Sequence, residues 1–227
     1  MNRPRLLAAA VPPLLAAALC GAAVSGAPAA AAAPDSAPAA RPPVPHCVAS
    51  DGFDFNAVYH VRERIIAPPP TCRVTLAKER WVRATFGWGT AKDAKSAVYP
   101  TGYQPLRPGI APIDDFDAKF VSATYVHDIG TPQEQTFTFK KKQVLRTGLL
   151  SSDGFPYSAP VSPPFKALSV GTHTSTVFIT LSAEHCDGIE PDRDADCLPA
   201  GTTRFSGDDA FEVQPRPRDQ HPRRLPG

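Results

Sequence analysis

Alternation of apolar and polar residues with a period of two is the strongest pattern in this chain. In VGTHTSTVFITLSAEH, residues 170–185, Phe178 and Thr180 lie on one face, and Val177 and Ile179 on the other. In DAFEVQP, residues 209–215, the apolar side chains of the alternating run fall on one side. Alternation of this kind, rich in β-branched and aromatic residues, predicts half-buried β-strands.

Weaker alternation extends this prediction over most of the region from residue 56 to residue 214. Strands are expected in NAVYHVRERIIA (56–67), DAKFVSATYVHDIG (117–130) and EQTFTFKKKQVLRTG (134–148), while TCRVTLAKERWVRATFGW (71–88) fits two β-stretches or a short helix. Proline and glycine punctuate residues 92–115 and 151–164, which we therefore expect to be long surface connections.

Short strands joined by proline-rich turns, with no long helical pattern between them, indicate an all-β fold. The stretch LSVGTHTSTVFITLS, residues 168–182, resembles the beginning of a late strand in the immunoglobulin-like and fibronectin-like modules of exported bacterial proteins. This resemblance covers about fifteen residues, carries no fixed chemistry, and implies an antiparallel β-sandwich with long Pro/Gly-rich connections.

The N-terminus has the features of a secretory signal peptide. Arg3 and Arg5 precede an apolar run from Leu6 to Leu19, and small residues follow it. We place the signal peptide at residues 1–33, a Pro/Ala-rich linker at 34–46, one β-sandwich domain at 47–214 and a disordered basic tail at 215–227. A membrane anchor is the alternative, but the run is short and interrupted by two prolines. Lipidation at Cys20 is a second alternative, although Leu19 stands where a small residue is expected.

Export determines how the cysteines are interpreted. Cleavage leaves Cys47, Cys72, Cys186 and Cys197, and an even number in an exported chain predicts two disulfides. The sequence favours the local pairing of Cys47 with Cys72 and Cys186 with Cys197. A long-range bridge remains an alternative, and zinc is disfavoured because neither pair has C-x-x-C spacing.

Charge gives little information about partners. The chain has 24 Lys and Arg, 22 Asp and Glu, and a net charge of +2, so loss of Arg3 and Arg5 leaves a nearly neutral protein. Four arginines among the prolines of the tail are a weak signal for nucleic acid. We therefore expect no nucleic-acid partner and no transmembrane anchor, and an envelope polymer, a glycan or a protein as the partner.

Acidic residues crowd the segment HCDGIEPDRDADCLPAG, residues 185–201. Asp192, Asp194 and Asp196 have the spacing that begins a calcium loop, but the glycine and glutamate expected later in such a loop are absent. The sequence favours a solvated acidic loop closed by Cys186 and Cys197, with weak calcium binding as the alternative.

Motifs for catalysis are absent from the sequence. It has no nucleophile elbow, phosphate loop or dinucleotide fingerprint, and its histidines lack metal-binding spacing. Trp88, Tyr99 and Tyr103 form the best ligand-binding candidate, because loops on a rigid scaffold often carry binding; packing over one end of the sandwich is the alternative. We predict a non-catalytic extracellular or cell-envelope binding module. A small secreted carbohydrate-active hydrolase or lyase is the alternative function.

Overall fold

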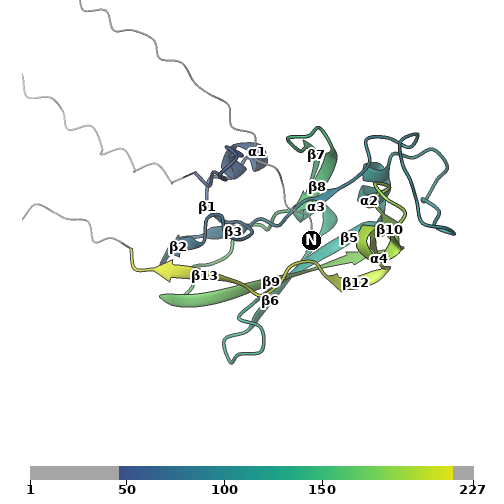
Figure 1. Ribbon diagram of the computed structural model, residues 1–227. Coiled ribbons are helices and arrows are strands. Elements are labelled where there is room, and N and C mark those ends of the chain that lie inside the picture. The colour runs from purple at the N-terminus through teal and green to yellow at the C-terminus, as the bar shows by residue number, and fades with distance from the viewer. Residues whose placement is uncertain (1–45, 217–227) are drawn as a thin grey trace, which may run out of the picture. The chain divides into compact units, whose positions relative to one another are not determined.

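A computed structural model describes residues 46–216 of the chain (Figure 1). The predicted signal peptide lies outside the described residues, as do the linker before His46 and the tail after Arg216. No helix among residues 46–216 has the length and apolar character needed to cross a membrane.

The described residues form mostly strands with four short helices. The strands are β1 (Arg64–Ile66), β2 (Val74–Leu76), β3 (Trp81–Arg83), β4 (Trp88–Gly89), β5 (Phe120–His127), β6 (Gln135–Lys140), β7 (Leu145–Leu150), β8 (Pro156–Pro160), β9 (Gly171–Leu181), β10 (His185–Cys186), β11 (Cys197–Leu198), β12 (Gly201–Arg204) and β13 (Asp209–Gln214). The helices are α1 (Phe55–Tyr59), α2 (Pro112–Lys119), α3 (Lys141–Val144) and α4 (Arg193–Asp196).

The large sheet is built around β9, the longest strand. Its strands follow the order β2-β13-β9-β5-β6, and β12 pairs with the second half of β9 beyond the end of β13. The pairs that involve β9 are all antiparallel, whereas β13 and β2 are parallel. The alternation of β9 explains its burial, because His173, Ser175, Val177, Ile179 and Leu181 face the protein interior.

Smaller sheets pack against this interior face of the large sheet. β1 pairs with β3, β10 with β11, and β4, β8 and β7 form a three-stranded sheet. The main core unites residues of β1, β3, β5, β9, β13, α2, α3 and the connection before β9, and its buried members are Ile66, Trp81, Phe116, Phe120, Ala123, Tyr125, Val144, Phe165, Val177, Ile179, Leu181, Phe211 and Val213. In Figure 1, β1 and β3 lie above β9 and β13, while β2 lies beside β13, its partner in the large sheet.

Both local disulfides predicted from the sequence are present. Cys47 bonds to Cys72, and Cys186 bonds to Cys197 across the short β10–β11 pair. The first joins the segment before α1 to the segment before β2. The second closes the acidic loop, as the sequence predicts.

The β-rich class is confirmed, and so are the strands at β9 and β13, but four local predictions are wrong. The expected strand 134–148 is not continuous, because the helix α3 separates β6 from β7. The first half of the expected strand 56–67 lies in α1 and the turn after it, because Asp54 caps the helix by accepting the Ala57 N–H at 3.0 Å. The expected connection 151–164 contains β8, which pairs with both β4 and β7. The end of the expected connection 92–115 and the start of the expected strand 117–130 form α2, which begins at Pro112 and carries acids in its first turn and a lysine in its last.

Candidate functional site

The three aromatic residues singled out in the sequence gather around one aspartate. Trp88 lies on β4, and Tyr99 and Tyr103 lie in the connection before α2, where their ring centroids are 4.9 Å apart. The Trp88 ring lies 6.3 Å from the ring of His185. Tyr103 is buried and donates its hydroxyl to Oδ2 of Asp115 at 2.7 Å. These aromatic residues therefore form the wall around a polar centre.

Asp115 on α2 accepts four hydrogen bonds. Besides Tyr103, its Oδ2 accepts from Nζ of Lys119 at 2.7 Å and from Nδ1 of His185 at 2.9 Å, and its Oδ1 accepts from the Leu106 N–H at 2.7 Å. We call Tyr103, Asp115, Lys119 and His185 the Asp115 cluster. It connects α2 to the preceding loop and to β10, next to the Cys186–Cys197 bond.

Burial and hydrogen bonds determine which groups of the Asp115 cluster carry a proton. Burial opposes ionisation of Asp115, but the donors from His185, Lys119, the Leu106 N–H and Tyr103 outweigh it and hold the pKa of Asp115 below its usual range. Burial lowers the pKa of His185 despite its bond to Asp115. Burial, with help from the bond to Asp115, raises the pKa of Tyr103. The cluster therefore contains a carboxylate, a neutral imidazole and a neutral phenol.

This cluster cannot meet a substrate directly. The side chains of Asp115 and His185 are fully buried, and that of Lys119 is 2% exposed. Two buried ring atoms near it, Nε2 of His185 and Nε1 of Trp88, have no hydrogen-bond partner among the described residues. One is an acceptor and the other a donor, and the burial of the whole cluster suits structural support. Of this cluster, Tyr103 was singled out in the sequence as a ligand-binding candidate; Asp115, Lys119 and His185 were not, and their only signal was the Asp115–Lys119 spacing of i, i+4.

Two open grooves lie on the surface near the Asp115 cluster. The α2–β7 groove has a volume of about 440 Å³ and is lined by Ile113, Asp114, Asp117, Thr147, Gly148, Leu149, Leu150 and Pro156. The Phe155 groove has a volume of about 260 Å³ and is lined by Ala91, Lys92, Ser96, Phe155, Gly188 and Ile189. Phe155 of one groove and Pro156 of the other are consecutive residues.

Apolar and charged side chains are mixed in these grooves. Leu150 is 65% exposed, Ile189 44% and Phe155 38%, and Nζ of Lys92 lies 5.5 Å from the centre of the Phe155 ring. Asp117 accepts the Ser158 hydroxyl at 2.7 Å, and burial raises the pKa of Asp117. Exposed apolar groups beside a few fixed polar groups are typical of a binding surface.

The acidic loop uses one of its predicted calcium ligands for another purpose. Asp192 caps α4 by accepting the N–H groups of Asp194 and Ala195, at 3.0 and 3.2 Å. In the described residues, the group of potential metal ligands that lies within 4.8 Å is Glu184, Cys186 and Cys197, and its two cysteines are joined in a disulfide. Calcium binding by Asp192, Asp194 and Asp196 stays a prediction.

Replacing Asp192 by alanine tests both roles of this loop. Loss of the cap is expected to lower the free energy of unfolding by about 1 kcal/mol, measured by urea denaturation with and without calcium. Since we favour the solvated loop, millimolar calcium should raise the Tm of the unaltered protein little or not at all. A rise of several degrees that Asp194→Ala abolishes would establish a calcium site instead.

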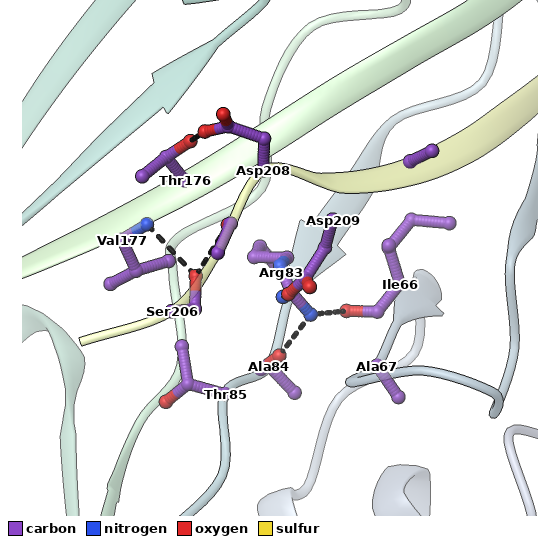
Figure 2. A network of polar contacts seen from close by, with 12 residues as sticks. Ile66, Ala67, Arg83, Ala84, Thr85, Thr176, Val177, Ser206, Asp208 and Asp209 are labelled. Atoms are coloured by element: carbon purple, nitrogen blue, oxygen red, sulfur yellow. Dashed lines mark hydrogen bonds and ion pairs between the residues drawn. The ribbon is translucent and has the colours of Figure 1, made fainter. Parts of the chain in front are cut away.

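A second buried ion pair joins the two sides of the core (Figure 2). The guanidinium of Arg83 on β3 is fully buried, pairs with the carboxylate of Asp209 at the start of β13, and donates to the carbonyls of Ala84 and Ile66 at 2.6 and 3.2 Å. Burial, partly offset by Asp209, lowers the pKa of Arg83 to about 10. With its charge matched, and with the side chain of Asp209 only 15% exposed, this pair acts as a structural link between the strands.

Comparison with protein-family profiles, with curated proteins and with solved structures found no significant match. The function is therefore argued from the geometry of the site.

Proposed function

We propose that this chain is a secreted, disulfide-stabilised binding module that holds a neutral glycan in the α2–β7 and Phe155 grooves. The observation that carries the proposal is the exposure of Phe155 in the lining of the Phe155 groove, next in sequence to Pro156, which lines the α2–β7 groove. In the immunoglobulin-like sandwich predicted from the sequence, loops at one end of the strands carry the ligand.

Charge and shape favour a glycan as the partner. The α2–β7 groove has two carboxylates, Asp114 and Asp117, and no basic residue in its lining, which disfavours an anionic polymer. Carboxylates accept hydrogen bonds from sugar hydroxyls, and the apolar side chains next to them, such as Leu150, suit the C–H faces of a sugar ring.

A peptide strand is a weaker candidate for this groove. β7 is an edge strand, to which a peptide could add. Its pairing with β8 is, however, interrupted between Arg146 and Leu149, and Gly148 there has a φ of 71°. An irregularity of this kind at an edge opposes the addition of another strand. Recognition by side chains is therefore favoured over main-chain pairing.

Replacing Phe155 by alanine is expected to weaken binding to an insoluble polysaccharide about fivefold, because an aromatic contact contributes about 1 kcal/mol. The measurement is co-sedimentation of the secreted protein with purified cell wall, chitin and xylan over a range of protein concentrations. Phe86→Ala is the matched control, since Phe86 is 63% exposed and lies outside both grooves. Absence of binding to all three polymers, or equal losses in the two variants, would count against the proposal.

A further inference from the structure

A serine, a histidine and an aspartate lie in line where β5 ends and β9 begins. Nδ1 of His173 is 2.8 Å from Oδ2 of Asp128, and Nε2 of His173 is 3.5 Å from Oγ of Ser169. Asp128 follows the last residue of β5, and the antiparallel pairing of β5 with β9 places it next to His173. Nothing in the spacing of these three residues along the chain marks a catalytic motif. The fold brings them together.

Backbone groups of Thr174 hold the aspartate in place. The N–H of Asp128 donates to the Thr174 carbonyl at 3.1 Å, and its Oδ1 accepts the Thr174 N–H at 2.9 Å. Asp128 has a φ of 53°, a left-handed conformation that is uncommon for residues other than glycine. Strained backbone held by neighbouring contacts often occurs at functional sites. Its Oδ2 is thereby fixed opposite the imidazole.

The exposure of the three side chains fits a surface nucleophile with a buried base and a buried carboxylate that orients the base. Ser169 is exposed, whereas His173 and Asp128 are 8% and 9% exposed. With its proton on Nδ1, toward Asp128, His173 presents the lone pair of Nε2 to the serine hydroxyl. Nε2 lies closer to the carbonyl oxygen of Ser169, at 3.0 Å, than to its hydroxyl, so it must move from the carbonyl to Oγ before it can act as the base. A structural clamp is the competing explanation for this contact.

We propose that Ser169 is the nucleophile of an acyl-transfer centre that hydrolyses short-chain esters, an activity beyond the proposed glycan binding. Ser169 Oγ forms a bond to the ester carbonyl carbon as its proton passes to Nε2 of His173. The carbon–oxygen bond to the alcohol then breaks, and the alcohol leaves with that proton. Water, deprotonated by His173, attacks the acyl-serine and releases the carboxylic acid, which restores the serine.

The surroundings of Ser169 indicate a small acyl group. The next residue, Val170, is 56% exposed, so an ester would lie on an open surface with one apolar side chain beside it. The N–H of Val170 is the next donor along the chain, whereas that of Gly171 belongs to the pairing of β9 with β13; a donor directly after the nucleophile stabilises the oxyanion in other serine hydrolases. A short acyl chain such as acetyl needs no deeper pocket.

The test is labelling of the full secreted protein with a fluorophosphonate probe, followed by peptide mass spectrometry, together with hydrolysis of p-nitrophenyl acetate. We expect the probe on Ser169, and we expect both labelling and hydrolysis to be lost in Ser169→Ala. His173→Gln should reduce hydrolysis roughly 100-fold or more, the usual contribution of a general base. Circular dichroism and Tm establish that each variant is folded.

Ser50→Ala is the matched control, because Ser50 is also an exposed loop serine. Labelling of Ser50 and Ser169 to the same extent, or no labelling above denatured protein, would overturn the proposal and leave His173 as a clamp. Loss of polysaccharide binding in Phe155→Ala has no bearing on this result, since Phe155 is not part of this centre. Failure of either proposal can thus be told apart from failure of the other.

Discussion

Replacing Asp115 by alanine is expected to lower the free energy of unfolding by about 3–5 kcal/mol, because it leaves a buried positive charge without a partner. Lys119 is 2% exposed and has Asp115 as its ion-pair partner at 2.7 Å. The same change removes an acceptor from Tyr103 and from His185. Urea denaturation followed by tryptophan fluorescence measures the effect.

Two further variants make this prediction specific. Asp114→Ala, an exposed carboxylate one residue earlier in α2, should change stability by no more than about 0.5 kcal/mol. In the double variant Asp115→Ala, Lys119→Met, the unpaired charge is gone, so much of the lost stability should return. A loss below about 1 kcal/mol for Asp115→Ala alone would mean that the Asp115 cluster does not support this end of the domain.

The second large effect is expected from His127, which makes the protein less stable in acid. Burial lowers the pKa of His127 from 6.5 to about 4, with Asp128 opposing the shift. Between these pH values the unfolded chain binds more protons than the folded protein, so stability falls as the pH drops from about 6.5 to about 4. The difference in pKa corresponds to roughly 3 kcal/mol for this group.

His127→Phe is the variant that isolates this effect. The imidazole lies among the rings of Trp81, Phe137 and Phe165, at 4.9, 5.4 and 4.5 Å, and both of its nitrogens are buried without a partner among the described residues. A benzene ring suits these contacts, so we expect the difference in stability between variant and unaltered protein to increase on acidification.

Comparing two proteins removes the influence of other groups on the pH profile. Burial raises the pKa of Asp187 to about 6, and this carboxyl acts in the opposite direction over part of the same range. Its contribution is common to both proteins and cancels in the difference. Parallel stability curves from pH 7 to pH 4 would show that His127 is not the group responsible. His127→Leu repeats the comparison if the larger ring does not fit.

The elements of the fold that depend on strong local sequence patterns are predicted correctly. β9 and β13 follow from alternation, and the short disulfides follow from export and spacing. α1 was missed because one capping aspartate, Asp54, outweighs the β-branched residues after it. β8 was missed because its prolines hide a strand that pairs at both edges.

The candidate sites depend on contacts between distant residues, which a single sequence does not reveal. The sequence singles out Trp88, Tyr99 and Tyr103, and the structure places them around Asp115, but nothing in the order of residues shows that His185 joins them. The alignment of Ser169 with Asp128 likewise requires the pairing of β5 with β9.

The position of the Cys186–Cys197 bond has a practical consequence for producing this protein. Cys186 directly follows His185, so the bond that fixes β10 also fixes the imidazole beneath α2. A host whose cytoplasm keeps thiols reduced would leave this strand untethered while the long sheet around β9 still assembles. Material from such a host would give a convincing β-type spectrum and yet lack an ordered ligand surface, so oxidising expression is needed before any negative binding result is accepted.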